Sequence, residues 1–229
     1  MVDPLAEQLT ALARDLHEER GVEATLSGIV DAAVGTVPGA DHAGISQVKG
    51  RRTVRTTAAT DDLVRQVDQA QYDLGEGPCL DTLFTTRTVR VPELSTERRW
   101  PRFVARAREA GVGSILAYQL YVAQDGLGAL NLYSRSPYAF DDDAERVGAL
   151  FATHAAIALA GAKQSEQLTH AVDIRDLIGQ AKGILIERHR LTGDQAFRLL
   201  VRASQTTNTK LAEVARRLIE TGELAGRGG

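Results

Sequence analysis

The sequence predicts an α+β domain, built on an antiparallel sheet flanked by helices, followed by an all-α bundle of three helices. Two observations predict this arrangement. Short segments rich in Val, Ile, Thr and Tyr recur between residues 40 and 133, with helical stretches between them. After Tyr138 the chain has no proline, and its apolar residues follow the period of a helix. A length of 229 residues suits one medium domain and one small one.

Five segments are predicted to form the strands of the sheet. Several alternate apolar and polar residues, which is typical of a strand with one buried face. Their bounds are His42–Val48, Thr53–Ala59, Thr88–Val91, Ile115–Val122 and Leu127–Tyr133. The loop Ala123–Gly126 contains Asp-Gly, a strong hairpin signal, so the last two strands are predicted to form a hairpin.

Helices are predicted before and between the strands. The opening segment has apolar residues at helical spacing on both sides of Gly21, so two amphipathic helices or one interrupted helix are expected. These residues either pack in the core or form a helical dimer contact. They are Leu5, Leu9, Leu12, Leu16, Leu26, Ile29, Val30 and Ala33. Two further helices are predicted over Asp61–Ala70 and Arg102–Ala110, the second ending at Gly111.

A long helix is predicted to connect the two domains. Acidic residues are favoured at a helix N-terminus, so Asp141–Asp143 are expected to cap it. The sequence is compatible with a helix that continues to His189, with fraying near Gly161. One apolar stripe is predicted on its first half, formed by Val147, Leu150, Phe151, His154 and Ile157.

The tail is predicted to form three helices. The first shows a clear helical stripe over Ile174–Leu185. Thr192–Gln195 matches a capping box that opens the second helix, which is expected to end at Ala203. A polar turn over Ser204–Asn208 leads into the third helix, which is expected to stop near Gly222. Residues 226–229 are expected to be disordered.

Composition and charge restrict the class of protein. No segment approaches the ~18 consecutive apolar residues of a membrane helix, and the opening residues lack the apolar region of a secretion signal. The single cysteine, Cys79, fits a reducing compartment, so a cytoplasmic location is expected. The net charge of −3 is uneven, because residues 166–229 hold 10 Lys and Arg against 8 Asp and Glu.

Motifs that would indicate an enzyme or a metal site are missing from the sequence. The five histidines are scattered, and no nucleophile elbow, Walker loop or dinucleotide fingerprint occurs. We therefore expect no catalytic residue, no metal and no certain cofactor. Cys79, which follows Tyr72 in a turn-rich stretch, is interpreted as a small buried hydrophobe in preference to a redox-responsive or ligand-contacting thiol. Trp100 is interpreted as a core anchor in preference to a ligand-stacking ring.

Basic residues of the tail mostly avoid its apolar stripes and are expected to point outward. Such cations can neutralise phosphates, although the same pattern also occurs on an ordinary solvated surface. They are Lys182, Arg188, Arg190, Arg198, Arg202, Lys210, Arg216 and Arg217.

The tail resembles the ANTAR family, the RNA-binding antitermination module of bacterial regulators. The matching runs are Ile178–Leu185, Ala196–Leu200, Arg202–Ser204 and Asn208–Ala215. The resemblance implies binding to a pair of hairpins in nascent leader RNA. It implies phosphate or loop contacts for Lys182, Arg202 and Lys210, and the outward-facing Arg188 and Arg198 are added as candidate RNA contacts. It also implies base reading or turn capping for Ser204 and Asn208, where an N-cap role is equally open. Ala181 and Gly183 would permit close approach of a helix or of RNA.

The body resembles the GAF domain of regulators of the actinobacterial type, in which GAF precedes ANTAR. The matching residues are Gly75–Asp81, Arg99–Pro101, Gly128–Tyr133 and Phe151–Ala156. This resemblance implies a pocket for an unknown small molecule, with Tyr72, Cys79 and Trp100 as candidate sensor residues, and terminal helices that form a homodimer. The Asn-Lys-x-Phe-x-Glu pattern of cyclic-nucleotide GAF domains is missing, because Asn131 leads into Leu-Tyr-Ser.

The expected domains are a sensory domain over residues 1–165 and an RNA-binding domain over residues 166–225, followed by the short tail. The expected function is signal-responsive binding of leader RNA that prevents transcription termination, with RNA and a second copy of the chain as partners and neither DNA nor a membrane. The alternative is a DNA-binding helix-turn-helix factor with a GAF sensor, because a short turn joins the last two predicted helices. A protein–protein signalling module is a third possibility.

Overall fold

The computed structural model describes residue 14 and residues 21–49, 53–122 and 125–224, which form two compact units, Met1–Gln164 and Ser165–Gly229. The predicted helix with Leu5 to Leu16 and the predicted disordered end, residues 226–229, lie outside the described residues. No helix among the described residues is both long and apolar enough to span a membrane.

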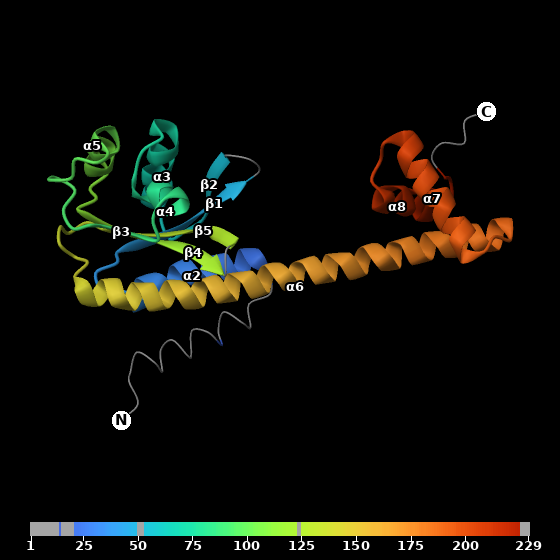
Figure 1. The fold of residues 1–229 in the computed structure, drawn as a ribbon, viewed down its shortest axis with the longest axis horizontal. Helices are drawn as coiled ribbons and strands as arrows, with labels where there is room; N and C mark the ends of the chain where they lie inside the picture. The colour runs from blue at the N-terminus through green and yellow to red at the C-terminus, as the bar shows by residue number, and fades with distance from the viewer. Residues whose placement is uncertain (1–13, 15–20, 50–52, 123–124, 225–229) are drawn as a thin grey trace, which may run out of the picture. The chain divides into compact units, whose positions relative to one another are not determined.

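A five-stranded antiparallel sheet forms the centre of the first unit, as predicted (Figure 1). Its spatial order is β2-β1-β5-β4-β3, so the last strand along the chain is the central one. The strands are β1 (His42–Lys49), β2 (Thr53–Ala59), β3 (Thr88–Val91), β4 (Ser114–Val122) and β5 (Asp125–Ser134). The predicted loop Ala123–Gly126 is too long, because Asp125 pairs with Val122 and Gly126 with Tyr121 inside the ladder.

Helices α2 (Val22–Thr36) and α6 (Asp142–His189) cover one face of the sheet. The apolar stripe predicted on α6 is buried along only one of its edges. Phe151 is fully buried and Val147 nearly so, whereas Leu150 and Ile157 are 46% and 60% exposed. At roughly 100° per residue the stripe spans an arc of about 120°, so Val147 and Phe151 lie along one edge of it and Leu150 and Ile157 along the other.

The other face of the sheet is covered by α3 (Asp62–Leu74), α4 (Pro78–Phe84) and α5 (Pro101–Glu109) (Figure 1). Helix α3 runs four residues beyond its predicted end, to the left-handed Gly75. Helix α4 was not predicted. Pro78 occupies its first turn, where the missing N–H of proline costs no hydrogen bond.

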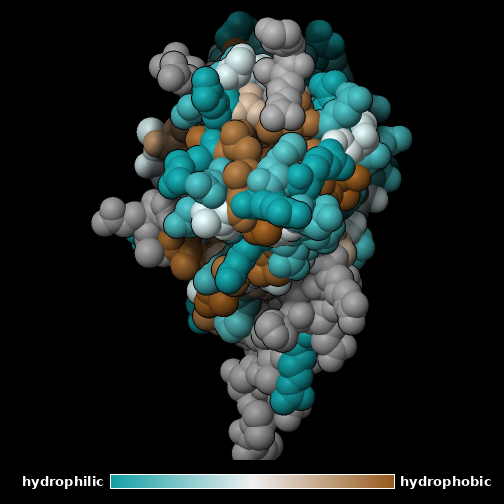
Figure 2. Space-filling view, turned by 90° about the vertical axis from the view of Figure 1, so that its right-hand side faces the viewer, coloured by the Kyte–Doolittle hydropathy of each residue, from teal (hydrophilic) through white to brown (hydrophobic). Residues whose placement is uncertain are grey.

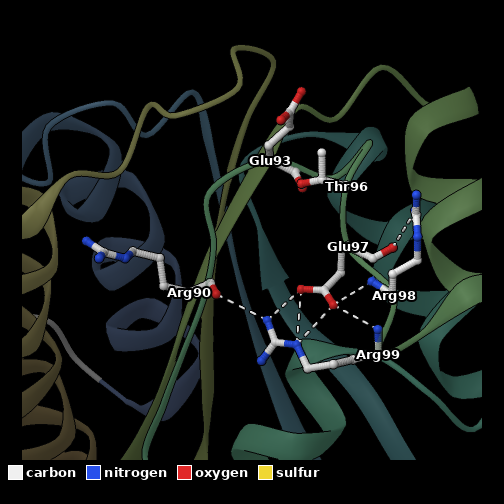
Figure 3. A network of polar contacts seen from close by, with 6 residues as sticks. All are labelled: Arg90, Glu93, Thr96, Glu97, Arg98 and Arg99. Carbon is white, nitrogen blue, oxygen red and sulfur yellow. Dashed lines mark hydrogen bonds and ion pairs between the residues drawn. The ribbon is translucent and has the colours of Figure 1, made fainter.

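The connection from β3 to α5 is held by Glu97. Its carboxylate accepts hydrogen bonds from the Arg99 guanidinium (2.6 Å) and from the backbone N–H groups of Arg98 and Arg99 (2.8 Å each) (Figure 3). The Arg99 hydrogen bonds, helped by these amides, lower the pKa of Glu97 to about 2. The same guanidinium lies 4.3 Å from the ring centroid of Trp100, which packs in the core beside Phe103.

The second unit contains the end of α6, α7 (Gly193–Thr207) and α8 (Leu211–Thr221). The predicted capping box is confirmed, because Thr192 and Gln195 each accept a hydrogen bond from the other's backbone. The predicted polar turn begins too early, since α7 continues through Thr207. Side chains from the three helices form a separate core. Its fully or nearly fully buried residues include Ala181, Leu185, Ala196, Leu200, Val214, Ala215 and Leu218.

Candidate functional site

A cluster of buried polar side chains surrounds Asp68 of α3, on the face of the sheet that α3, α4 and α5 cover. Thr56 donates a hydrogen bond to Asp68 Oδ2 (2.7 Å), and Ser46 donates to the same oxygen (3.4 Å). Asn131 Nδ2 donates to Asp68 Oδ1 (3.1 Å), and the Tyr133 hydroxyl donates to it as well. The carboxyl group is therefore enclosed by donors from three strands.

Burial has a strong effect on the acidity of this cluster. The side chain of Asp68 is fully buried, and desolvation raises its pKa from 3.8 to about 6, although the surrounding hydrogen bonds favour the charged form. Burial and the nearby Asp68 raise the pKa of the Cys79 thiol to about 12. The thiolate is the reactive form of cysteine, so Cys79 is held as an unreactive thiol.

Two of the three candidate sensor residues meet at this cluster. The Tyr72 hydroxyl lies 2.6 Å from Ser46 Oγ and 2.9 Å from Thr56 Oγ1. Cys79 is fully buried, as expected for a small hydrophobe, and its backbone N–H donates to Gln71 Oε1 (2.8 Å). Trp100 lies instead in the apolar core against α5, as expected for a core anchor.

Sequence reasoning missed Asp68 and Asn131, the two central residues of the cluster. A signal for Asp68 was available, because it follows the buried Val64 and Val67 on the inward stripe of α3, where a carboxylate is unusual. Asn131 Oδ1 is buried and has no hydrogen-bond partner among the described residues. Within the described ranges, no group of three or more potential metal ligands occurs.

The C-terminal unit presents the basic residues predicted for RNA contact. Arg198, Arg202 and Lys210 are exposed and Lys182 is half-buried. In the view of Figure 2, patches of hydrophobic surface lie among hydrophilic side chains. Arg188 also has a structural role, because its guanidinium donates a hydrogen bond to the carbonyl oxygen of Gly222 at the end of α8.

The remaining predicted RNA-contacting residues take varied positions. Ala181 is fully buried in the core of the bundle, where it permits close packing of the helices. Gly183 is exposed, and a Cβ there would meet no atom within 4 Å. Ser204 donates to the carbonyl of Thr209 (2.6 Å), and Asn208 is the left-handed C-cap of α7. Neither is an N-cap, the role considered for them above, because Lys210 occupies the N-cap of α8.

Comparisons with known proteins assign both units. The model of the GAF domain matches residues 19–160, and the model of the ANTAR domain matches residues 166–219. No match was found among curated proteins.

Solved structures resemble the first unit in fold. The GAF domain of a phosphoenolpyruvate-protein phosphotransferase from Acinetobacter is 14% identical, with a TM-score of 0.56, over 73% of this chain and 99% of that one. The chromophore-binding domain of an R. palustris bacteriophytochrome is 10% identical (TM-score 0.53), over 69% of this chain and 62% of that one. Free methionine-R-sulfoxide reductase from Neisseria meningitidis is 17% identical (TM-score 0.56), over 72% and 95%.

Proposed function

Because the chain belongs to the GAF domain family and carries an ANTAR domain after it, we propose that it binds hairpins in nascent leader RNA and prevents transcription termination when its GAF domain perceives a signal. ANTAR domains are RNA-binding antitermination modules and GAF domains are sensors, so the chain is a regulator. The match to the ANTAR model over residues 166–219 carries the proposal. We further propose that it acts in the cytoplasm without catalysing a reaction.

The exposed cations of the C-terminal unit support this proposal. Arg198 and Arg202 lie one helical turn apart on α7, so they point to the same side, and Lys210 is the N-cap of α8. Lys and Arg at such positions can neutralise phosphates and contact unpaired bases. RNA hairpins offer both, because loop bases are unstacked and their edges are accessible.

The experiment measures binding of the full chain to an RNA with two tandem hairpins bearing hexanucleotide loops, over a series of salt concentrations. Lys182→Ala and Lys210→Ala should weaken binding and make the dependence on salt shallower, because each removes one phosphate contact. Arg65→Ala, an exposed cation of α3 in the first unit, is the matched control. Equal or tighter binding to duplex DNA would support the helix-turn-helix alternative and contradict the proposal.

A homodimer through α6 is part of the proposal. Five large apolar residues are exposed on this helix, namely Leu150, Ile157, Leu168, Val172 and Ile186. Leu150 and Ile157 are seven residues apart, which is the repeat of a coiled-coil seam. Ile157→Glu should convert a dimer into a monomer in light scattering, whereas Glu187→Gln, at an exposed position near the end of α6, should not.

The buried cluster around Asp68 is our proposed sensing site, since two of the candidate sensor residues meet there. A signal that rearranges this cluster would alter the dimer or the RNA-binding unit through α6, which passes from one unit into the other. Asp68→Asn should then change the RNA affinity of the full chain. Asp31→Asn on the exposed side of α2 should leave it unchanged.

A further inference from the structure

The C-terminal unit has a groove of about 690 Å³ between the last part of α6 and α7. Ile174 and Ile178 contribute apolar surface to it, and Phe197 of α7 lines it from the opposite helix. Gly179 also borders the groove, and a Cβ at this position would meet no atom within 4 Å. The groove therefore combines an aromatic ring with open space beside it.

Phe197 displays its ring to solvent although its neighbours on α7 enter the core. It is 40% exposed, whereas Ala196 and Leu200 are fully buried. An exposed phenylalanine offers a flat apolar face at which a planar partner can stack. Phe197 was not among the contacts predicted from the sequence, because its apolar character suggested the core.

The charges around the groove favour an anionic partner. Arg175 and Lys182 line it, and among the described residues neither takes part in an ion pair or a side-chain hydrogen bond. Asp176 is the acidic residue of the lining. The Lys182 ammonium extends towards the start of α7, because a Cβ at Gly193 would lie 3.7 Å from its nitrogen.

We propose that this groove holds one unstacked base of an RNA hairpin loop, with the face of the base against the Phe197 ring and the adjoining phosphates at Lys182 and Arg175. This inference rests on the proposed RNA-binding function and adds the site at which a loop base is held. Single-stranded bases commonly stack on aromatic side chains, and nearby cations neutralise their backbone. A helix from a second copy fits less well, since it would bury two cations for which the groove supplies one acidic residue.

The test compares Phe197→Leu with Phe84→Leu in the full chain, using the tandem-hairpin RNA. Leucine keeps the apolar surface at position 197 but removes the aromatic face. Phe84 is a matched control, because it is a 63% exposed phenylalanine on α4 in the other unit. We expect Phe197→Leu to weaken RNA binding by roughly 5- to 100-fold. Phe84→Leu should bind like the wild type, and Phe197→Trp should retain affinity because indole also stacks.

RNAs that lack a single base in the loop identify the stacked nucleotide. At one loop position, removing the base should weaken wild-type binding and erase the difference between the wild type and Phe197→Leu. If no position behaves in this way, or if Phe197→Leu binds intact RNA like the wild type, the stacking inference is overturned while the proposed function stands. If Phe197→Leu changes the mass of the protein in light scattering but leaves the RNA affinity unchanged, the groove binds a second copy of the chain, and the stacking inference is again overturned. If the wild type binds no hairpin RNA, the proposed function itself fails.

Discussion

Asp68→Asn should change the pH dependence of stability in the first unit. The carboxyl group is fully buried and its pKa is raised from 3.8 to about 6, so the folded chain binds this proton more tightly than the unfolded chain. The stability linked to the proton is present below pH 3.8 and is lost as the pH rises through about 6. A rise of this size corresponds to roughly 3 kcal/mol in the free energy of unfolding.

Asparagine suits this test because it stays neutral and can be accommodated in the cluster. Its amide oxygen can accept from Asn131 and Tyr133, as Asp68 Oδ1 does. Its NH₂ group would replace Oδ2, where the Thr56 and Ser46 hydroxyls can rotate to accept instead of donate. The variant therefore avoids the buried charge without leaving several donors unpaired.

Urea unfolding followed by fluorescence measures the effect in the correct unit, because Trp100 is the only tryptophan of the chain. The free energy of unfolding of Asp68→Asn, minus that of the wild type, should increase by roughly 2.5 kcal/mol between about pH 4 and pH 7. The same difference is measured for Asp31→Asn, which removes an exposed carboxylate. A difference for Asp68→Asn that stays constant over this pH range would refute the reasoning.

Three further changes test the fold. Glu97→Gln should lower the free energy of unfolding more at pH 7 than at pH 3, because the pKa of Glu97 is held near 2 and the stability that its carboxylate contributes is lost on acidification. Trp100 fluorescence during urea unfolding measures this free energy, and an equal loss at both pH values would contradict the prediction. Leu200→Ala should destabilise the C-terminal unit by about 2–5 kcal/mol in unfolding followed by circular dichroism, whereas Gln205→Ala, at an exposed position of the same helix, should have little effect. Thr192→Ala should cost about 1 kcal/mol in the same assay by removing the cap of α7, a prediction that fails if the exposed Thr206→Ala costs as much.

Most elements of the fold could be predicted from local patterns. The bounds of the first four strands (within one residue), the capping box and the long helix agree with the structure because period, turn residues and caps act over a few positions. Helix α4 was missed because the glycines before it and the proline in its first turn also fit a loop. The loop between β4 and β5 was predicted too long, because Asp125–Gly126 pairs within the ladder although it resembles a turn sequence.

The buried cluster could not be derived in this way. It brings together Ser46, Asp68 and Asn131, which are far apart along the chain and meet because β1 pairs with β5 and α3 packs over them. Gly44 faces Asn131 across that ladder, and a Cβ on Gly44 would meet Val64 Cγ1 of α3 at 2.4 Å. Such proximity follows from tertiary packing, and no spacing in the sequence indicates it.

The central position of β5 determines the order in which the first unit can be completed during synthesis. Strands β1 and β2 can pair as soon as both exist, but the inner edge of β1 stays open until β5 has been made. An open edge with apolar side chains can pair wrongly with another chain. The contacts within the bundle of α7, α8 and the end of α6 join residues that are close in sequence, so the bundle should fold quickly. The period before residue 134 emerges from the ribosome is therefore the time at which this protein is most exposed to misfolding.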